Sequence, residues 1–291
     1  MNRSVLSPIE RHRPAVRWAQ RVVNVVLLVL LVIVGLGPLL WLAKSAVSTT
    51  QDTLRHPMGL WPSGFDFENL VTAWQDAQIG HYFLNTVKIA IGSWFLQLFV
   101  AVTGGYVLGI LRPWYARFLT GAVLVTLFVP PVVLLVPLFL TVLDLPIAGA
   151  SLLNSYWGIW LPAGASAFNV VLVKRFMEDL PREIIEAARV DGAGPFRLLV
   201  SIVLPLSKPV IGVVSVFAVL LTWKDYLWPL VVLPDPGIQP LSVRLPLVRD
   251  TLQLDVFLAA LAISMVLPIA LFIIFRRFFI SGEAMSGAIK G

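Results

Sequence analysis

The most distinctive residue pattern in this chain lies between two apolar stretches. Glu186-Ala187-Ala188 is followed by Gly192 after three residues, by Ile202 after nine more, and then by Leu204-Pro205. These residue types favour recognition over bond-breaking chemistry. The carboxylates of Glu186 and Asp191 can accept hydrogen bonds from arginine or backbone N–H groups of a partner, and the small alanines let another surface approach closely. The pattern therefore predicts a contact site for another protein.

The flanking residues predict a short helix that presents this contact site. Pro181 suits the first turn of a helix, because its missing N–H has no partner there in any case. Ile184-Ile185 adds an apolar anchor. Gly192 can adopt positive φ at the helix end and Gly194-Pro195 cannot continue the helix, so we expect a sharp turn and a second helix from about Phe196. On physical grounds alone, an amphipathic helix that rests on lipid headgroups and couples to nothing is an equally good interpretation.

A second group of polar and aromatic residues has the composition of a sugar path. Sugars present hydroxyl groups beside flat C–H faces, so their path needs amide or carboxylate partners next to aromatic rings. The candidates are Trp223, Lys224, Asp225, Tyr226, Trp228, Asn85 and Asn154, with Gln97 and Asn169 as further polar positions. The alternative for the aromatic group is an interfacial belt with a snorkelling lysine. For each amide the alternative is a helix-to-helix hydrogen bond.

The composition indicates an integral membrane protein and argues against an enzyme. The 291 residues are 58% hydrophobic and 13% charged, with a mean hydropathy of +0.87, whereas soluble domains are about 45–50% apolar and roughly 25% charged. The sequence has no G-x-x-x-x-G-K-[ST] phosphate loop, so we do not expect the chain to bind ATP by itself. It also has no nucleophile–base arrangement and no metal-ligand spacing. The absence of cysteine excludes disulfides and thiolate metal sites.

Six apolar segments are long enough to cross a bilayer core about 30 Å thick, which needs roughly 20 helical residues. We therefore expect an all-α polytopic fold with six transmembrane helices. The predicted spans are approximately Val22–Leu42, Tyr82–Leu111, Phe118–Leu140, Leu152–Val173, Val200–Val232 and Val256–Phe275. The second and fifth are longer than needed, so each is expected to include a turn outside the membrane. Prolines in or beside the spans, among them Pro130, Pro131 and Pro205, are expected to bend helices along a moving path.

The distribution of basic residues predicts the orientation. Lys and Arg gather in the N-terminal arm, after the second and fourth spans and near the C-terminus, which places these parts and both termini in the cytoplasm. The expected organisation is a cytoplasmic arm over 1–21, a membrane domain over 22–280 that includes the loop 178–205, and a cytoplasmic tail over 281–291 without regular structure. The asymmetry accounts for the net charge of +6, so we infer no nucleic-acid binding. At about 20 residues, the first apolar stretch is too long for a signal core.

The pattern 186–188, Gly192, Ile202 and 204–205 is similar to the EAA loop of ABC-importer permeases. The sequence from Leu180 through Ala193 resembles the carbohydrate-importer branch, the relatives of the maltose permease G subunit, and so do the C-terminal segments 278–282 and 287–291. The resemblance covers the second to sixth spans.

The resemblance implies an inner-membrane permease that imports a sugar by alternating access. It implies a second permease subunit as partner, two ATP-binding subunits that hold ATP and Mg, and an extracytoplasmic substrate-binding protein. The chain itself then catalyses nothing and binds no cofactor. The EAA helix of such permeases seats in a cleft of the ATPase, which assigns the coupling role to Ile184, Ile185, Glu186, Ala187, Ala188, Asp191 and Gly192.

The resemblance also bears on two external segments. The segment 44–80 is expected to be a short, partly ordered cap with aromatic rings at the headgroup level. The Pro-rich segment 233–250 corresponds to a loop that faces the binding protein in related permeases, although a Pro-rich turn without a partner is an equally good interpretation.

One departure from the family leaves the cargo open. The family commonly has Trp-Asn-Glu-Phe where this chain has Trp223-Lys224-Asp225-Tyr226. A polyol or glycerol phosphate is an alternative cargo, for which only Lys224 and Lys88 offer basic lining groups. An ion-coupled secondary carrier is a further alternative, but it would need ionisable groups at membrane depth, whereas Asp144 and Asp225 fall toward the outer edge.

Overall fold

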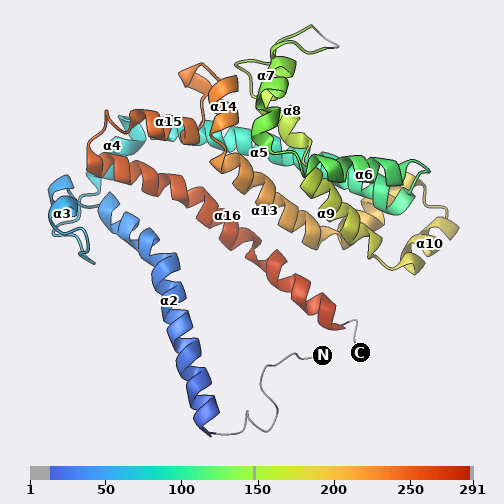
Figure 1. Ribbon diagram of the computed structural model, residues 1–291, viewed down its shortest axis with the longest axis horizontal. Coiled ribbons are helices and arrows are strands. Elements are labelled where there is room, and N and C mark those ends of the chain that lie inside the picture. The colour runs from blue at the N-terminus through green and yellow to red at the C-terminus, as the bar shows by residue number, and fades with distance from the viewer. Residues whose placement is uncertain (1–13, 147–148, 289–291) are drawn as a thin grey trace. The chain divides into compact units, whose positions relative to one another are not determined.

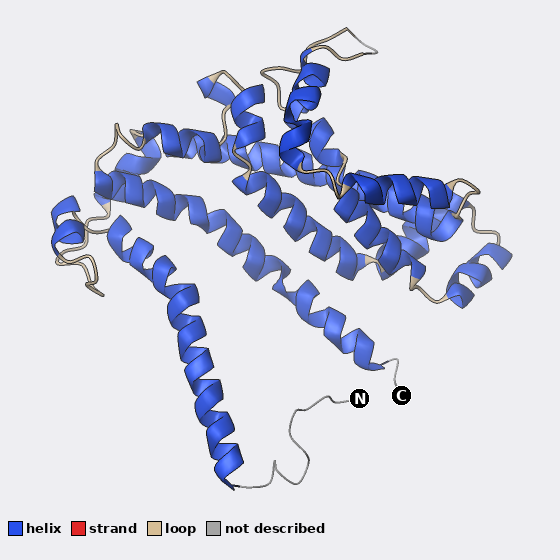
Figure 2. Ribbon diagram, in the orientation of Figure 1, coloured by secondary structure: helices blue, strands red, loops and turns tan. Residues whose placement is uncertain are grey.

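All regular structure in the described chain is helical, as predicted. The computed structural model describes residues 14–146 and 149–288, and within these residues there is no β-strand (Figure 2). The chain divides into two compact units, one formed by residues up to Ala73 with Leu252–Ile263, and one by Trp74–Thr251 with the residues from Ser264 onward. Each unit is described by itself.

The helices are labelled as in Figure 1. The first unit contains α2 (Pro14–Ala46), α3 (Thr50–Arg55), most of α4 (Glu68–Gln75) and the start of α16 (Leu254–Ala288). The second begins with α5 (Ile79–Tyr106), the π-helical η1 (Val107–Leu111), α6 (Ala116–Thr126), the 3₁₀ turn η2 (Pro131–Leu134), α7 (Leu135–Leu143), α8 (Trp157–Gly164) and α9 (Ala167–Glu178). It continues with α10 (Arg182–Val190), α11 (Pro195–Leu198), the π-helical η3 (Leu199–Val203), α12 (Leu204–Leu206), α13 (Lys208–Lys224), α14 (Leu227–Val232), the 3₁₀ turn η4 (Pro236–Ile238) and α15 (Leu241–Val248).

Six spans were predicted, and bends or breaks interrupt several of them in the described residues. In the described residues three helices are long and apolar enough to cross a membrane, over Val16–Ala46, Ile79–Leu111 and Leu254–Ile274, or up to five spans if each of two bent pairs counts as one. The predicted fourth span is instead divided near Ala165 into α8 and α9, each of which is too short alone. Pro162 lies in the last turn of α8 and Ser166 caps α9 by accepting the N–H of Asn169, so the chain restarts its helix at this point.

Proline accounts for the bends in the two pairs. Helices α6 and α7 meet at 99° across Pro130 and Pro131. A proline ring disfavours the α conformation of the residue before it, and proline has no N–H to donate within a helix. The segments 195–206 and 208–224 meet at 79° beside Pro205 and Pro209.

The expected turns occur in only one of the two long segments. The fifth segment does contain breaks, at Ser207 and at Asp225. The prediction is wrong for the second segment, since α5 continues through η1 to Leu111 and the break comes only at Arg112, which has a φ of 47°. Helix α16 is also longer than predicted, because it extends to Ala288 rather than ending before Ser281.

Helix α5 forms the axis of the second unit, with α8, α9 and α13 packed against it (Figure 1). Glycines permit the close approach: a Cβ on Gly105 would lie 2.7 Å from Val173 Cγ1 and 3.0 Å from the backbone nitrogen of Lys174. The buried Asn169 side chain donates from Nδ2 to Oε1 of the buried Gln97 at 2.9 Å. This bond confirms the helix-to-helix interpretation for these two amides.

In the first unit, the segment after α2 is ordered by one carboxylate. Asp52 accepts hydrogen bonds from both the hydroxyl and the backbone N–H of Ser63, and its Oδ2 lies 3.5 Å from Nζ of the equally buried Lys44. Asn69 donates to the carbonyl of Ser48 at 3.0 Å, and the rings of Phe65 and Phe67 stack at 5.9 Å. The predicted partly ordered cap is therefore two short helices joined by a hydrogen-bonded loop.

We expect Gly92→Ala to destabilise the packing of α8 on α5. A Cβ on Gly92 would lie 2.1 Å from Cε2 of Trp160, whose indole N–H donates to the carbonyl of Ile89. An inserted methyl that displaces a held ring costs about 1–3 kcal/mol, which a lower Tm of the purified chain would reveal. Gly121→Ala is the matched control, because nothing lies within 4 Å of its added Cβ and alanine favours the helix. Equal Tm values for the two variants would contradict this packing.

We expect the segment around Asp52 to open in acid. Hydrogen bonds from Ser63, reinforced by the Lys44 ammonium, hold the pKa of Asp52 below its usual range. A depressed folded pKa stabilises the segment above the unfolded pKa of about 3.9, and this contribution is lost as the pH falls through the folded value. Protection of the amides of 48–69 from hydrogen exchange, relative to their intrinsic exchange rates at the same pH, should therefore fall below about pH 4 in the native chain. Asp52→Asn should remove that acid dependence, and an unchanged dependence in this variant would assign it to other groups.

Candidate functional site

The predicted contact helix exists, and its end has the predicted geometry. Helix α10 covers Arg182–Val190, with Pro181 immediately before it. Gly192 has a φ of 80° and donates its N–H to the carbonyl of Arg189 at 3.0 Å, and the next residue, Ala193, donates to the carbonyl of Ala188 at 2.9 Å. A left-handed residue followed by a bond back into the last turn is a common helix terminus. The positive φ at position 192 therefore favours glycine over any residue that has a Cβ.

The second predicted helix also begins where expected. Gly194 precedes α11 in an extended conformation with a φ of −66°, and Pro195 occupies the first helical position. The hydroxyl of Tyr106, at the end of α5, donates to the carbonyl of Pro195 at 2.8 Å. Ile202 and Leu204 follow in the same helical run, which bends by 79° beyond Leu206. The turn after α10 is thus fixed to the central helix of the unit.

The structure divides the residues of the contact helix between two faces. Ile185 and Ala188 are buried at 7% exposure in a cluster that includes Met177 and Leu198. Both side chains fill the core of their own chain and so do not offer a surface for direct contact, while the predicted coupling role of the helix stays a prediction. Ile184, Glu186, Ala187 and Asp191 are exposed. The surface available to a partner is therefore the charged and small-residue face of α10.

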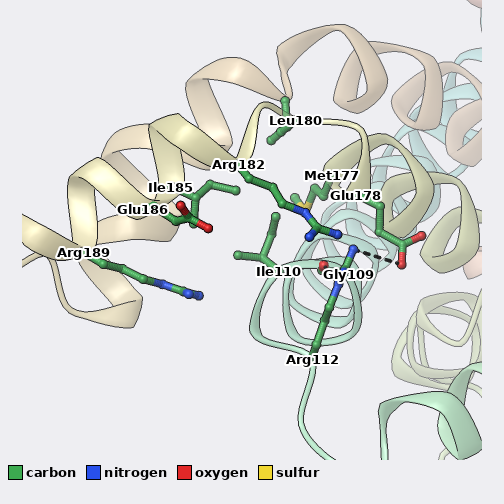
Figure 3. A pocket seen from close by; sticks show the side chains of 10 residues that line it. All are labelled: Gly109, Ile110, Arg112, Met177, Glu178, Leu180, Arg182, Ile185, Glu186 and Arg189. Atoms are coloured by element: carbon green, nitrogen blue, oxygen red, sulfur yellow. Dashed lines mark hydrogen bonds and ion pairs between the residues drawn. The ribbon is translucent and has the colours of Figure 1, made fainter.

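A pocket of about 180 Å³ lies between α10, the end of α9 and η1 (Figure 3). Its charged lining residues are Arg112, Glu178, Arg182, Glu186 and Arg189. Side chains from three separate segments thus meet behind the contact helix, and three of these five are cationic.

Glu178 joins the segments around the pocket. Its carboxylate lies 2.8 Å from Nζ of Lys174, 3.6 Å from Arg112 and 3.8 Å from Arg175. Arg112 also donates from Nε to the carbonyl of Gly109 at 2.7 Å, a local bond that closes the end of η1. This cluster was not predicted from the sequence, although the i, i+4 spacing of Lys174 and Glu178 is a recognisable helix pair. No local sequence pattern predicts that Arg112, which lies 66 positions earlier, approaches Glu178.

The outer aromatic group is only partly free to meet a ligand. Trp223 packs edge-on against Phe83 with centroids 5.5 Å apart, and Trp228 donates its indole N–H to the carbonyl of Gly158 at 3.0 Å. Lys224 ends α13 and is exposed, as is Tyr226. The backbone carbonyl of Asp225 accepts the hydroxyl of Ser242 at 2.6 Å. The exposed polar chemistry of this stretch therefore centres on Lys224 and Tyr226.

The two asparagines proposed for the path have structural hydrogen bonds. Asn85 is 1% exposed, donates to the carbonyls of Gly237 and Gln239 at 2.9 and 3.2 Å, and accepts the hydroxyl of Tyr156 at 3.0 Å. Asn154 lies outside any helix with a φ of 57°, where its side-chain oxygen accepts the N–H of Asp235 at 3.1 Å. Both tie other elements to the segment that follows α14. The hydrogen bonds given above join the two amides to backbone groups and to Tyr156, not to Lys224 or Tyr226.

The described part of the chain contains no candidate metal-binding site of the usual side-chain ligands. No group of three or more His, Cys, Asp or Glu side chains there is arranged to hold an ion.

Comparison with known proteins identifies the family. The profile of the binding-protein-dependent transport system inner membrane components matches residues 101–282, which include α10, the Gly192 turn and the bent segment up to α13. The chain belongs to this family and is a membrane component of a transport system. The matched range contains the whole pattern at 186–205. The match confirms the resemblance found in the sequence.

Individual relatives extend the likeness over most of the chain. The diacetylchitobiose uptake system permease protein NgcG of Streptomyces coelicolor is 28% identical over 91% of this chain and 87% of its own length. The sn-glycerol-3-phosphate transport system permease protein UgpE of Agrobacterium fabrum is 26% identical over 91% and 95%. A bacterial ABC transporter involved in the import of the acidic polysaccharide alginate contains a chain with the same fold, with a TM-score of 0.82 at 23% identity over 92% of this chain and 99% of that one.

We expect Gly192→Thr to loosen the end of α10. A Cβ there meets no atom within 4 Å, so the penalty comes only from the left-handed backbone, roughly 1–2 kcal/mol for a residue with a Cβ. Hydrogen exchange of the amides of 186–198 should accelerate accordingly. Gly194→Thr is the matched control, because Gly194 has equally open space but an extended backbone that precedes a helix and suits threonine. Equal exchange in the two variants would mean that the turn does not depend on the positive φ.

Proposed function

We propose that this permease is a subunit of an ATP-driven importer of a sugar and that α10 is its contact with the ATP-hydrolysing partner. The observation that carries the proposal is the division of α10 into a buried and an exposed face. Ile185 and Ala188 attach the helix to its own core, while Glu186 and Ala187 remain exposed. A partner that moves this exposed face would also move the residues behind it.

The attachment of α10 supports transmission of force in both directions. Before the helix, an ion pair joins Glu178 at the end of α9 to Arg112 at the end of η1. After it, the Gly192 turn leads to Pro195, which is bonded to Tyr106 of α5. Both ends therefore lead to α5, so a displacement of α10 would reach the central helix without a flexible linker. Two-state closure of packed helices is a known way to convert such a displacement into a change of access.

The proposed assembly follows the division of labour implied by the resemblance to ABC-importer permeases. Two ATP-binding subunits would hold ATP and Mg on the cytoplasmic side and contact α10, and a second permease subunit would complete the path. Both termini of this chain would then be cytoplasmic. On the other side, an extracytoplasmic binding protein would deliver the cargo, and the segment 233–250, which contains η4 and α15, is its proposed docking surface.

A sugar is the proposed cargo. NgcG is named for diacetylchitobiose uptake and the transporter of the same fold for import of alginate. Lys224 and Tyr226, with the ring of Trp223 beside them, offer a donor, a hydroxyl and an aromatic face at the outer end of α13. UgpE supports glycerol phosphate as the second candidate, for which Lys224 would be the anion-binding group. Competition between unlabelled sugars and glycerol phosphate in uptake assays would separate the two candidates.

We expect Glu186→Lys to abolish uptake while the protein remains in the membrane. The change replaces an exposed hydrogen-bond acceptor with a cation between Arg182 and Arg189, so a basic partner surface would be repelled instead of bound. The measurements are uptake in cells and co-purification of an ATP-binding subunit with the tagged chain in mild detergent. Both should fall together.

Asp179→Lys is the matched control for this prediction. Asp179 is exposed at the C-terminal end of α9, only seven positions away, where a cation is favourable for the helix dipole. It should therefore keep uptake and co-purification near the native level. Normal uptake by Glu186→Lys would count against the coupling role of α10.

A further inference from the structure

The pocket behind α10 contains an excess of positive charge. Arg112, Arg182 and Arg189 line it together with the two carboxylates Glu178 and Glu186. Glu178 already faces Lys174 and Arg175 as well as Arg112. In Figure 3 the side chain of Arg182 extends toward that of Arg112. Two guanidinium groups directed into one pocket repel each other, so the arrangement favours an anion between them.

The charge excess persists although a carboxylate is within reach along the helix. Glu186 follows Arg182 by four residues and precedes Arg189 by three, and ion pairs on helices form at these spacings. Yet neither arginine makes an ion pair within the described part of the chain. Both guanidinium groups thus keep their planar, bidentate donor sets free for a phosphate or carboxylate.

The remaining lining of the pocket is apolar. Four hydrophobic side chains line the pocket together with the arginines: Ile110, Met177, Leu180 and Ile185. The pocket volume of about 180 Å³ greatly exceeds the roughly 10–15 Å³ that a single water molecule requires. A ligand that fits this lining has an anionic group for the arginines and an apolar part for the four hydrophobic side chains.

We propose that this pocket binds the phosphodiester headgroup of an anionic phospholipid. Arg182 and Arg189 hold the phosphate together with the outer guanidinium edge of Arg112, and the glycerol backbone lies against Ile110 and Leu180. Basic pockets between helices at the cytoplasmic surface are suited to such headgroups. The bound lipid neutralises the cations behind α10 and braces the helix from the membrane side.

The inference rests on the proposed orientation, which places α10 at the cytoplasmic surface, but its test does not require uptake or the ATPase. The full-length chain is purified in zwitterionic detergent and titrated with dioleoylphosphatidylglycerol or dioleoylphosphatidylcholine. Native mass spectrometry counts the bound lipid and thermal unfolding reports stabilisation. The native chain should retain phosphatidylglycerol and gain Tm, with little response to phosphatidylcholine.

The discriminating variant is Arg182→Gln/Arg189→Gln, because both side chains are exposed and neither forms an ion pair that holds the fold. Loss of two basic groups near an anionic lipid should weaken phosphatidylglycerol binding roughly thirtyfold. Arg117→Gln/Arg197→Gln is the matched control, since these exposed arginines fall on the same predicted side and outside the pocket. If the glutamine variant does not fold, Arg182→Lys/Arg189→Lys keeps the charge and should still weaken binding by loss of the bidentate contacts.

Two results would overturn the proposal. One is equal phosphatidylglycerol binding by the pocket and control variants, which would mean that the lipid binds elsewhere. The other is a Tm gain of the same size from inorganic phosphate without lipid, abolished in the pocket variant, which would assign the site to a soluble anion.

Discussion

In the hydrocarbon core of a bilayer, every backbone N–H and C=O must be hydrogen-bonded by the protein itself. The rest of this structure depends on that constraint. Helix α5 with η1 meets it without interruption from Ile79 to Leu111. Where prolines interrupt the chain, the backbone is rescued locally: at the bend beside Pro205 the N–H of Ser207 donates to the carbonyl of Val203 at 2.9 Å. Such a bend is therefore compatible with a membrane, because the backbone N–H beside it is still hydrogen-bonded within the chain.

Because the helices satisfy their own backbones, close side-chain packing decides how they associate. Lipid tails are as apolar as leucine, so helix contact gains little from the hydrophobic effect and depends on small residues and buried polar pairs. Gly92 and Gly105 on α5 admit Trp160 and Val173 at distances that no larger residue would allow. The bond between Gln97 and Asn169 fixes the register of α9 on α5. The position of α10 follows from that register, because α9 leads directly into it.

The sequence predicted the local features of this site and missed those that depend on distant segments. The turn at Gly192 and the helix start at Pro195 were predictable, since glycine and proline restrict the backbone by themselves. The burial of Ile185 and Ala188 was not, because the 186–188 pattern does not reveal which face of a helix packs on its own chain. The roles of Asn85 and Asn154 were likewise hidden, since the bonds that tie them to other elements join positions 71 to 154 apart in the sequence. The break inside the fourth predicted span was missed for a related reason, because hydropathy averages over the residues near Ala165 while the backbone changes conformation there.

In the proposed coupling role, the nine-residue helix α10 would have to act as a stiff connector, and the same physical constraints bear on whether it can. A helix held only by apolar side chains could roll on its neighbours, because such contacts have no preferred direction. Here the end of α9 is attached to Arg112 by the ion pair from Glu178 at 3.6 Å, and the segment after α10 is held by the hydrogen bond from Tyr106 to Pro195. Rolling of α10 would break one of these contacts. The motion that costs least is therefore a change of angle at the next break in the chain. That break is the 79° bend beside Ser207, where no side-chain bond from another helix is needed to keep the backbone satisfied. A push on α10 would therefore be carried rigidly to α5 and α9, and the change of angle would occur between α12 and α13.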